Sequence, residues 1–172
     1  MVAVPLTVER RMDHPLSAQL RGKDRRQILH RLGFIVGRTV TGLEAIQVSA
    51  LREYLAQRFP IGQIWVLGAE QGGMTALYAA AADERISGAL VVDYFQKREN
   101  AWKEPVDRML YGQLIEFGDA EVAALVAPRP LVLATTPDGP APVATRAPAG
   151  AGGLWAIRRL IWSMISATST LS

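Results

Sequence analysis

The sequence has no cysteine among its 172 residues. Disulfide bonds, thiolate catalysis and cysteine-bound zinc or iron–sulfur sites are therefore excluded. It also lacks any run of about 18 apolar residues, which an ordinary membrane-spanning helix needs. The N-terminus lacks the order of a secretory signal, because its arginines follow the apolar stretch. These absences lead us to expect a cytoplasmic protein without a membrane partner.

Histidine is also scarce, and so are acidic residues toward the C-terminus. The only histidines are His14 and His30, and no acidic residue follows Asp138. No group of His, Asp and Glu has the spacing of metal ligands, so neither a metal nor another cofactor is expected. Basic residues gather between Arg10 and Arg38, but acidic residues are mixed among them. Such a stretch is more often a solvated helix face than a nucleic-acid site, and no nucleic-acid partner is expected.

Hydrophobic residues make up 49% of the chain, which is enough for one domain with a buried core. Residues 1–22 are predicted to be an irregular N-terminal segment that leads into the domain, in which VAVPLTV could form at most an edge strand. Residues 23–138 form the expected domain. Residues 139–172 are predicted to be a low-complexity linker and a terminal apolar helix.

The terminal segment LWAIRRLIWSMI, residues 154–165, has three interpretations. It could lie on anionic lipid as an amphipathic helix, or it could cover an exposed sheet as a docked helix. It could also belong to a foreign or frameshifted tail. The third interpretation is favoured because the composition changes abruptly near residue 136.

The apolar periodicity predicts α/β architecture with three recognisable strands. Strands are expected near residues 63–67, 88–93 and 130–135, parallel and adjacent, with a helix after Gly72. Helices are predicted over 25–38, with Asp24 as N-cap, and over 43–59, packed on the sheet. Their expected buried stripes are Ile28, Leu29, Leu32, Ile35 and Val36 in the first, and Leu43, Ile46, Ala50, Leu51, Tyr54 and Leu55 in the second. Short helices are expected over 96–118, and then a helix for which Asp119 is the N-cap.

Residues 68–73, GAEQGG, join a predicted buried strand to a helix of small residues. This is the shape of a nucleophile elbow, in which glycines allow a very tight turn and lift the middle residue to a helix N-terminus. A tight turn without function is an alternative. A phosphate loop is weakly supported, because the Lys-Ser/Thr of a P-loop is absent.

From about residue 13 to residue 136, the chain resembles the dienelactone-hydrolase and acetyl-xylan-esterase-like branch of the α/β-hydrolases. The resemblance rests on three stretches: RRQILHRLGFIVGRTVTGLEAIQVSALREYL, GAEQGGMTALYAAAADERISGALVVDYFQKRENAW and EFGDAEVAALVAPRPLVLA. It implies a partial α/β-hydrolase fold with a parallel sheet covered by helices. It also implies that the ancestral reaction is hydrolysis of a carboxylic ester.

The resemblance places Glu70 where the family has its nucleophilic serine, and Asp138 where the family has its acid. The backbone N–H groups of Gln71 and Gly72 would contribute to the oxyanion hole. Because the fold's triad runs nucleophile, acid, histidine, the upstream His14 and His30 leave the general base unfilled.

We therefore expect a truncated, catalytically inactive hydrolase. Alternatives are a carboxylesterase that uses Glu70, or a non-catalytic module that binds a small ligand or a partner protein. A residual pocket could still take a small-molecule ester, and an exposed sheet edge could allow self-association.

Six other positions carry further expectations. Trp65 is expected in the core, and Tyr94 and Phe95 either in the core or at the rim of a residual pocket. Asp93 is interpreted as a remnant of a polar site or as a cap. His14 is expected to be solvated or structural, and so is His30, at the polar edge of its helix.

Overall fold

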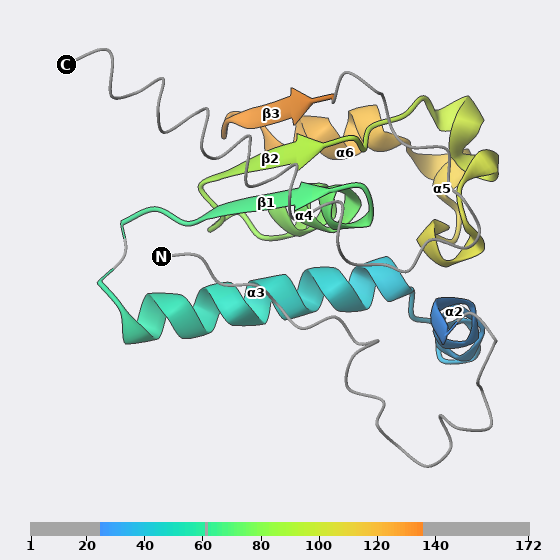
Figure 1. Ribbon diagram of the computed structural model, residues 1–172, viewed down its shortest axis with the longest axis horizontal. Coiled ribbons are helices and arrows are strands. Elements are labelled where there is room, and N and C mark those ends of the chain that lie inside the picture. The colour runs from blue at the N-terminus through green and yellow to red at the C-terminus, as the bar shows by residue number, and fades with distance from the viewer. Residues whose placement is uncertain (1–24, 61, 136–172) are drawn as a thin grey trace.

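The computed structural model describes residues 25–60 and 62–135 (Figure 1). Helices and strands alternate along this part of the chain. In order they are α2 (Arg25–Ile35), α3 (Val40–Arg58), β1 (Trp65–Ala69), α4 (Gln71–Ala82), β2 (Gly88–Val92), the 3-10 helices η2 (Arg98–Lys103) and η3 (Val106–Arg108), α5 (Gln113–Glu116), α6 (Asp119–Val126) and β3 (Leu131–Ala134). The expected α/β class is confirmed.

The sheet has the predicted pairing. Its order is β1-β2-β3 and both pairs are parallel, with Leu67 beside Leu90 and Leu90 beside Val132. β1 lies two residues later than predicted, because the ladder continues through the glycine and alanine that precede the turn. The N–H of Glu70 extends it by donating to the Val92 carbonyl over 2.9 Å.

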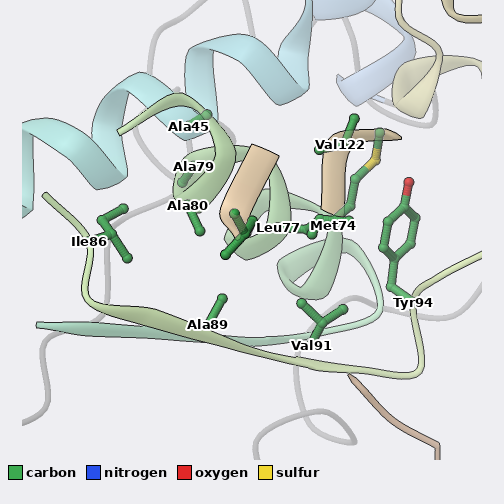
Figure 2. Close-up of a cluster of buried hydrophobic side chains, with 11 residues drawn as sticks. Ala45, Met74, Leu77, Ala79, Ala80, Ile86, Ala89, Val91, Tyr94 and Val122 are labelled. Carbon is green, nitrogen blue, oxygen red and sulfur yellow. The ribbon is translucent and has the colours of Figure 1, made fainter. Parts of the chain in front are cut away.

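One face of the sheet packs on α4, with α3 and α6 beside that helix (Figure 1). Figure 2 shows Ala89 and Val91 of β2 pointing from the sheet toward Leu77 of α4. Alternation along a strand sends every second side chain to the same face, so these positions form the core. The helix α4 is rich in alanine, which lets it pack closely on the strands.

The predicted burial of the α3 stripe is wrong. Ile46 and Tyr54 are 62% and 59% exposed, whereas Glu44 and Arg52 are buried. α3 packs mainly along α4 rather than on the sheet. Its buried polar side chains are paired with groups of opposite charge, which lowers the cost of removing them from water.

Two other core assignments are also wrong. Leu32 and Ile35 in α2, and Val36 directly after it, are exposed, because the helix packs at the end of α3 and against η3 instead of on the sheet. Trp65 is 42% exposed. It lies in β1, at an edge of the sheet among the described residues, and its ring lies over Gly88.

The short helices expected over 96–118 are present as η2, η3 and α5. The role of Asp119 is corrected: the N-cap of α6 is Gly118, and Asp119 is the first residue of the helix. The Gly118 N–H donates to Glu121 Oε2 over 2.8 Å. The expectations for Asp24, for residues 1–22 and for residues 139–172 lie outside the described residues.

Candidate functional site

The turn from β1 into α4 is the most constrained part of the described chain. A Cβ at Gly68 would lie 1.9 Å from the Gly72 carbonyl oxygen, so only glycine fits there. Between these glycines, Glu70 has φ 50 and ψ −116, which L-residues with a side chain rarely adopt. The turn is therefore as tight as the glycine pattern predicts, and it holds Glu70 under backbone strain.

Glu70 lies directly before the first turn of α4. The first helical bond runs from the Met74 N–H to the Glu70 carbonyl, 3.1 Å away. The N–H groups of Gln71, Gly72 and Gly73 consequently have no acceptor within the helix. The Glu70 side chain is exposed and makes no capping hydrogen bond, so its carboxylate faces solvent beside these donors.

A network of buried polar side chains holds Gln71, the residue after the turn. Its Nε2 donates to Glu44 Oε2 over 3.2 Å, and its Oε1 accepts from Arg108 Nε over 2.6 Å. Glu44 also accepts from Thr75 Oγ1, at 3.0 Å, one helical turn further along α4. The start of α4 is thus attached to α3 and η3 through side chains.

The network continues from Glu44 to Arg26 in α2. Arg26 donates to Glu44 over 2.6 Å and to Asp107 over 2.7 Å. Burial acts to lower the pKa of Arg26, but the hydrogen bonds to these carboxylates and their negative charges outweigh burial and raise it. Local patterns could not reveal these contacts, because 27 and 37 positions separate Gln71 from its two partners.

A second buried cluster surrounds Asp119. Its Oδ1 accepts from the hydroxyls of Tyr78 and Tyr94 at 3.2 and 3.1 Å, and its Oδ2 accepts from the Gln96 N–H at 3.1 Å. Burial raises the pKa of Asp119 while these hydrogen bonds oppose the rise. Burial and the charge of Asp119 also raise the pKa of both tyrosines. The cluster joins the exit of β2 to α4 and α6, which is a structural role.

Asp93 lies at the carboxyl end of β2, next to Glu70 at the end of β1. Ala69 and Val92 are register partners, so the residues that follow them are neighbours. Asp93 also has a positive φ of 52. Tyr94 points into the core beside α4 (Figure 2). Phe95, in contrast, is 42% exposed. The structure therefore brings Glu70, Gln71, Gly72 and Asp93 together at the carboxyl ends of β1 and β2.

The histidines do not complete this site. His30 is buried rather than at a polar edge, and its ring lies 5.9 Å from that of Tyr111. Its Nδ1 has no hydrogen-bond partner among the described residues. His14 and the acid candidate Asp138 lie outside the described residues.

Two shallow depressions occur away from the turn. One, of about 340 Å³, lies between α3 and α4 beside Tyr78, and another, of about 390 Å³, lies beside Leu29 and Leu43. Neither is lined by Glu70. Within residues 25–60 and 62–135, no three His, Asp or Glu side chains are grouped as metal ligands. None of the helices in these two ranges is long and apolar enough to cross a membrane.

Comparison of the chain with protein-family models, with curated proteins and with solved structures finds no match.

Proposed function

We propose that this chain is a divergent domain of the α/β-hydrolase type, similar to dienelactone hydrolases and acetyl xylan esterases, that has lost carboxylic-ester hydrolysis. The observation that carries the proposal is the conformation of Glu70. A strained residue between close-packed glycines, at the junction of a parallel strand and a helix, is the geometry in which this fold exposes its nucleophile.

Loss of ester hydrolysis follows from the chemistry of the residues present. Attack by the Glu70 carboxylate on an ester would give an anhydride, which is a poor route to products. A general base is also missing, because both histidines precede Glu70 in sequence and His30 is buried beside Tyr111. The unpaired N–H groups at the start of α4 would remain as an oxyanion-binding remnant.

The test is ester turnover by the purified full chain. We expect no hydrolysis of p-nitrophenyl acetate above a buffer control and no labelling by a fluorophosphonate. The variant Glu70→Ser should also be inactive, because a serine without a base is a weak nucleophile. Turnover that disappears in Glu70→Ala but persists in the control Glu84→Ala would refute the proposal.

A second candidate function uses Glu70 as a nucleophile toward saturated carbon. The exposed carboxylate at a strained turn favours it. With an alkyl halide, a bond would form between a Glu70 oxygen and the carbon, and the carbon–halogen bond would break with release of halide. Without a base to activate water, the ester would accumulate. Intact mass spectrometry should then show one alkyl adduct that is absent in Glu70→Gln.

The remaining alternative is a non-catalytic module that binds a small ligand or a partner protein. A chain that neither hydrolyses esters nor becomes alkylated would leave this alternative.

A further inference from the structure

Gln71, the first residue of α4, has a side chain that is hydrogen-bonded at both ends. Its Nε2 donates to Glu44 Oε2 over 3.2 Å, and its Oε1 accepts from Arg108 Nε over 2.6 Å. Glu44 is buried and the Arg108 side chain is only 14% exposed, so both partners are largely removed from water. An amide satisfies a carboxylate and a guanidinium together because it carries both a donor and an acceptor. Loss of either bond would leave a poorly solvated group without its partner, which is costly.

The positions on either side of Gln71 offer little to hold the turn. Glu70 is exposed and makes no capping hydrogen bond, and Gly72 and Gly73 have no side chain. Glycine loses more conformational freedom on folding than any other residue, so a helix with two glycines in its first turn opens readily there. Among residues 70–73, the side-chain attachment to the rest of the domain therefore comes from Gln71.

The partners of Gln71 are themselves held in place. Glu44 Oε1 accepts from Arg26 over 2.6 Å. The same Arg26 donates to Asp107 over 2.7 Å, and Asp107 precedes Arg108 in η3. α2 and the first turns of α3 lie on the side of the molecule toward which the strands point (Figure 1). Gln71 is thus attached to a frame of three elements, α2, α3 and η3.

The conformation of Glu70 requires such a fixed point. Its φ of 50 and ψ of −116 are strained, and strain persists only where the surroundings enforce it. The bond from its N–H to the Val92 carbonyl fixes the residue from the side of β1. On the other side, the bond from the Met74 N–H to the Glu70 carbonyl exists only while the first turn of α4 is closed. If that turn opened, the backbone of Glu70 could relax.

We propose that Gln71 is the positioning residue of this turn. Its side-chain amide, held between Glu44 and Arg108, keeps the first turn of α4 closed and so holds Glu70 in the strained conformation that presents its carboxylate to solvent. The inference rests on the proposed function only in taking Glu70 as the exposed residue of a nucleophile elbow. It does not require that Glu70 reacts, so ester turnover would refute the proposed function and leave this inference standing.

The test is the coupling between the two residues in the full chain. Glu70→Gly relieves the strain, so it should raise the urea concentration at which half of the protein is unfolded. In the Gln71→Ala background the strain is already released, and the gain from Glu70→Gly should shrink by more than half. The matched background is Gln57→Ala, on the exposed face of α3, in which the gain should be unchanged. An equal gain in both backgrounds, or no gain in the unmodified chain, would overturn the proposal.

Amide hydrogen exchange of the full chain gives a local readout. The Met74 N–H exchanges when the first turn of α4 opens, so Gln71→Ala should speed its exchange several-fold relative to the Leu77 N–H of the same helix. In Gln57→Ala the ratio of the two rates should equal that of the unmodified chain. Arg108→Gln, which removes the donor to the Gln71 oxygen, serves as the second variant if Gln71→Ala does not fold. An unchanged ratio in the variant that lacks the anchor would contradict the proposal.

Discussion

At the scale of single residues, Glu70 combines a side chain that reaches solvent with a backbone that glycine would prefer. Strain of this kind costs on the order of 1–3 kcal/mol and persists only where the surroundings enforce it. Here the surroundings are the ladder bond to Val92 and the first helical bond to Met74, which hold both sides of the residue.

Replacing Glu70 by glycine should therefore stabilise the protein. The relief of strain is partly offset by the larger backbone entropy that glycine loses on folding, so we expect a net gain of about 1 kcal/mol. Glu70→Ala keeps a Cβ and should gain nothing. Urea unfolding of the three proteins measures the difference, and Gln57→Gly, in the exposed face of α3, should instead lose about 1 kcal/mol. A Glu70→Gly protein no more stable than Glu70→Ala would show that the turn is unstrained.

The stability of the fold should depend on pH through Asp83, which follows α4. Burial acts to raise its pKa, but hydrogen bonds from Arg85 and Arg52 outweigh burial and lower the pKa to about 2. A carboxyl with a lowered pKa stabilises the fold above its unfolded value, about 3.9, and loses that contribution as pH falls toward 2. The urea concentration at which half of the protein is unfolded should therefore decrease as the pH is lowered from 4 to 2.

Asp83→Asn should flatten this fall while lowering stability at neutral pH, because the buried guanidinium of Arg52 loses the charge of one of its two carboxylate partners and keeps only the more exposed Glu53. The control Glu84→Gln changes a neighbouring exposed carboxylate and should keep the slope of the unmodified chain. Identical slopes in all three proteins would show that Asp83 does not carry the acid sensitivity.

At the scale of elements, the β1–α4 turn contains two glycines that differ in whether a side chain would fit. A Cβ at Gly68 meets the Gly72 carbonyl, whereas a Cβ at Gly72 meets nothing within 4 Å. Gly68→Ala should therefore force β1 and α4 apart and cost about 3 kcal/mol or more. Gly72→Ala lies in a helix and should gain about 0.5–1 kcal/mol. Thermal and urea unfolding of both variants test the geometry, and similar effects of the two changes would contradict it.

At the scale of the whole molecule, a group of apolar side chains is exposed to solvent in the last turn of α2 and directly after it. Phe34, Ile35 and Val36 are 64%, 78% and 69% exposed. Exposed apolar clusters favour association, so we expect the full chain to self-associate at high concentration. Ile35→Lys with Val36→Lys should shift light-scattering masses toward the monomer, whereas Gln57→Lys should not.

Association that persists in the doubly substituted chain would instead fit the sheet-edge contact predicted from the sequence. Among the described strands, β1 pairs only with β2, and its segment WVLGA carries no charge that would protect an edge. A monodisperse monomer at every concentration would contradict both surfaces.

The sequence by itself determined the local units of this protein and their order. Apolar runs too short for helices predicted the three strands, and the alternation with helices predicted parallel pairing. The glycines around Glu70 predicted a tight turn, because the steric demand of such a turn is met within six consecutive residues. The presence of Glu70 at the exposed position and the lack of a later histidine are also properties of the sequence alone.

Only the tertiary structure decided which sides of these units are buried. Periodicity showed an apolar stripe on α3, but packing along α4 instead buried Glu44 and Arg52, which find partners on α2, α4 and the loop after it. Trp65 was expected in the core, but among the described strands β1 lies at an edge of the sheet, and Trp65 is partly exposed there. Gln71 is held by Glu44 and Arg108. The physical reason is common to these cases: a side chain's burial and partners depend on residues far away in sequence, whereas propensity, periodicity and turn chemistry act only between neighbours.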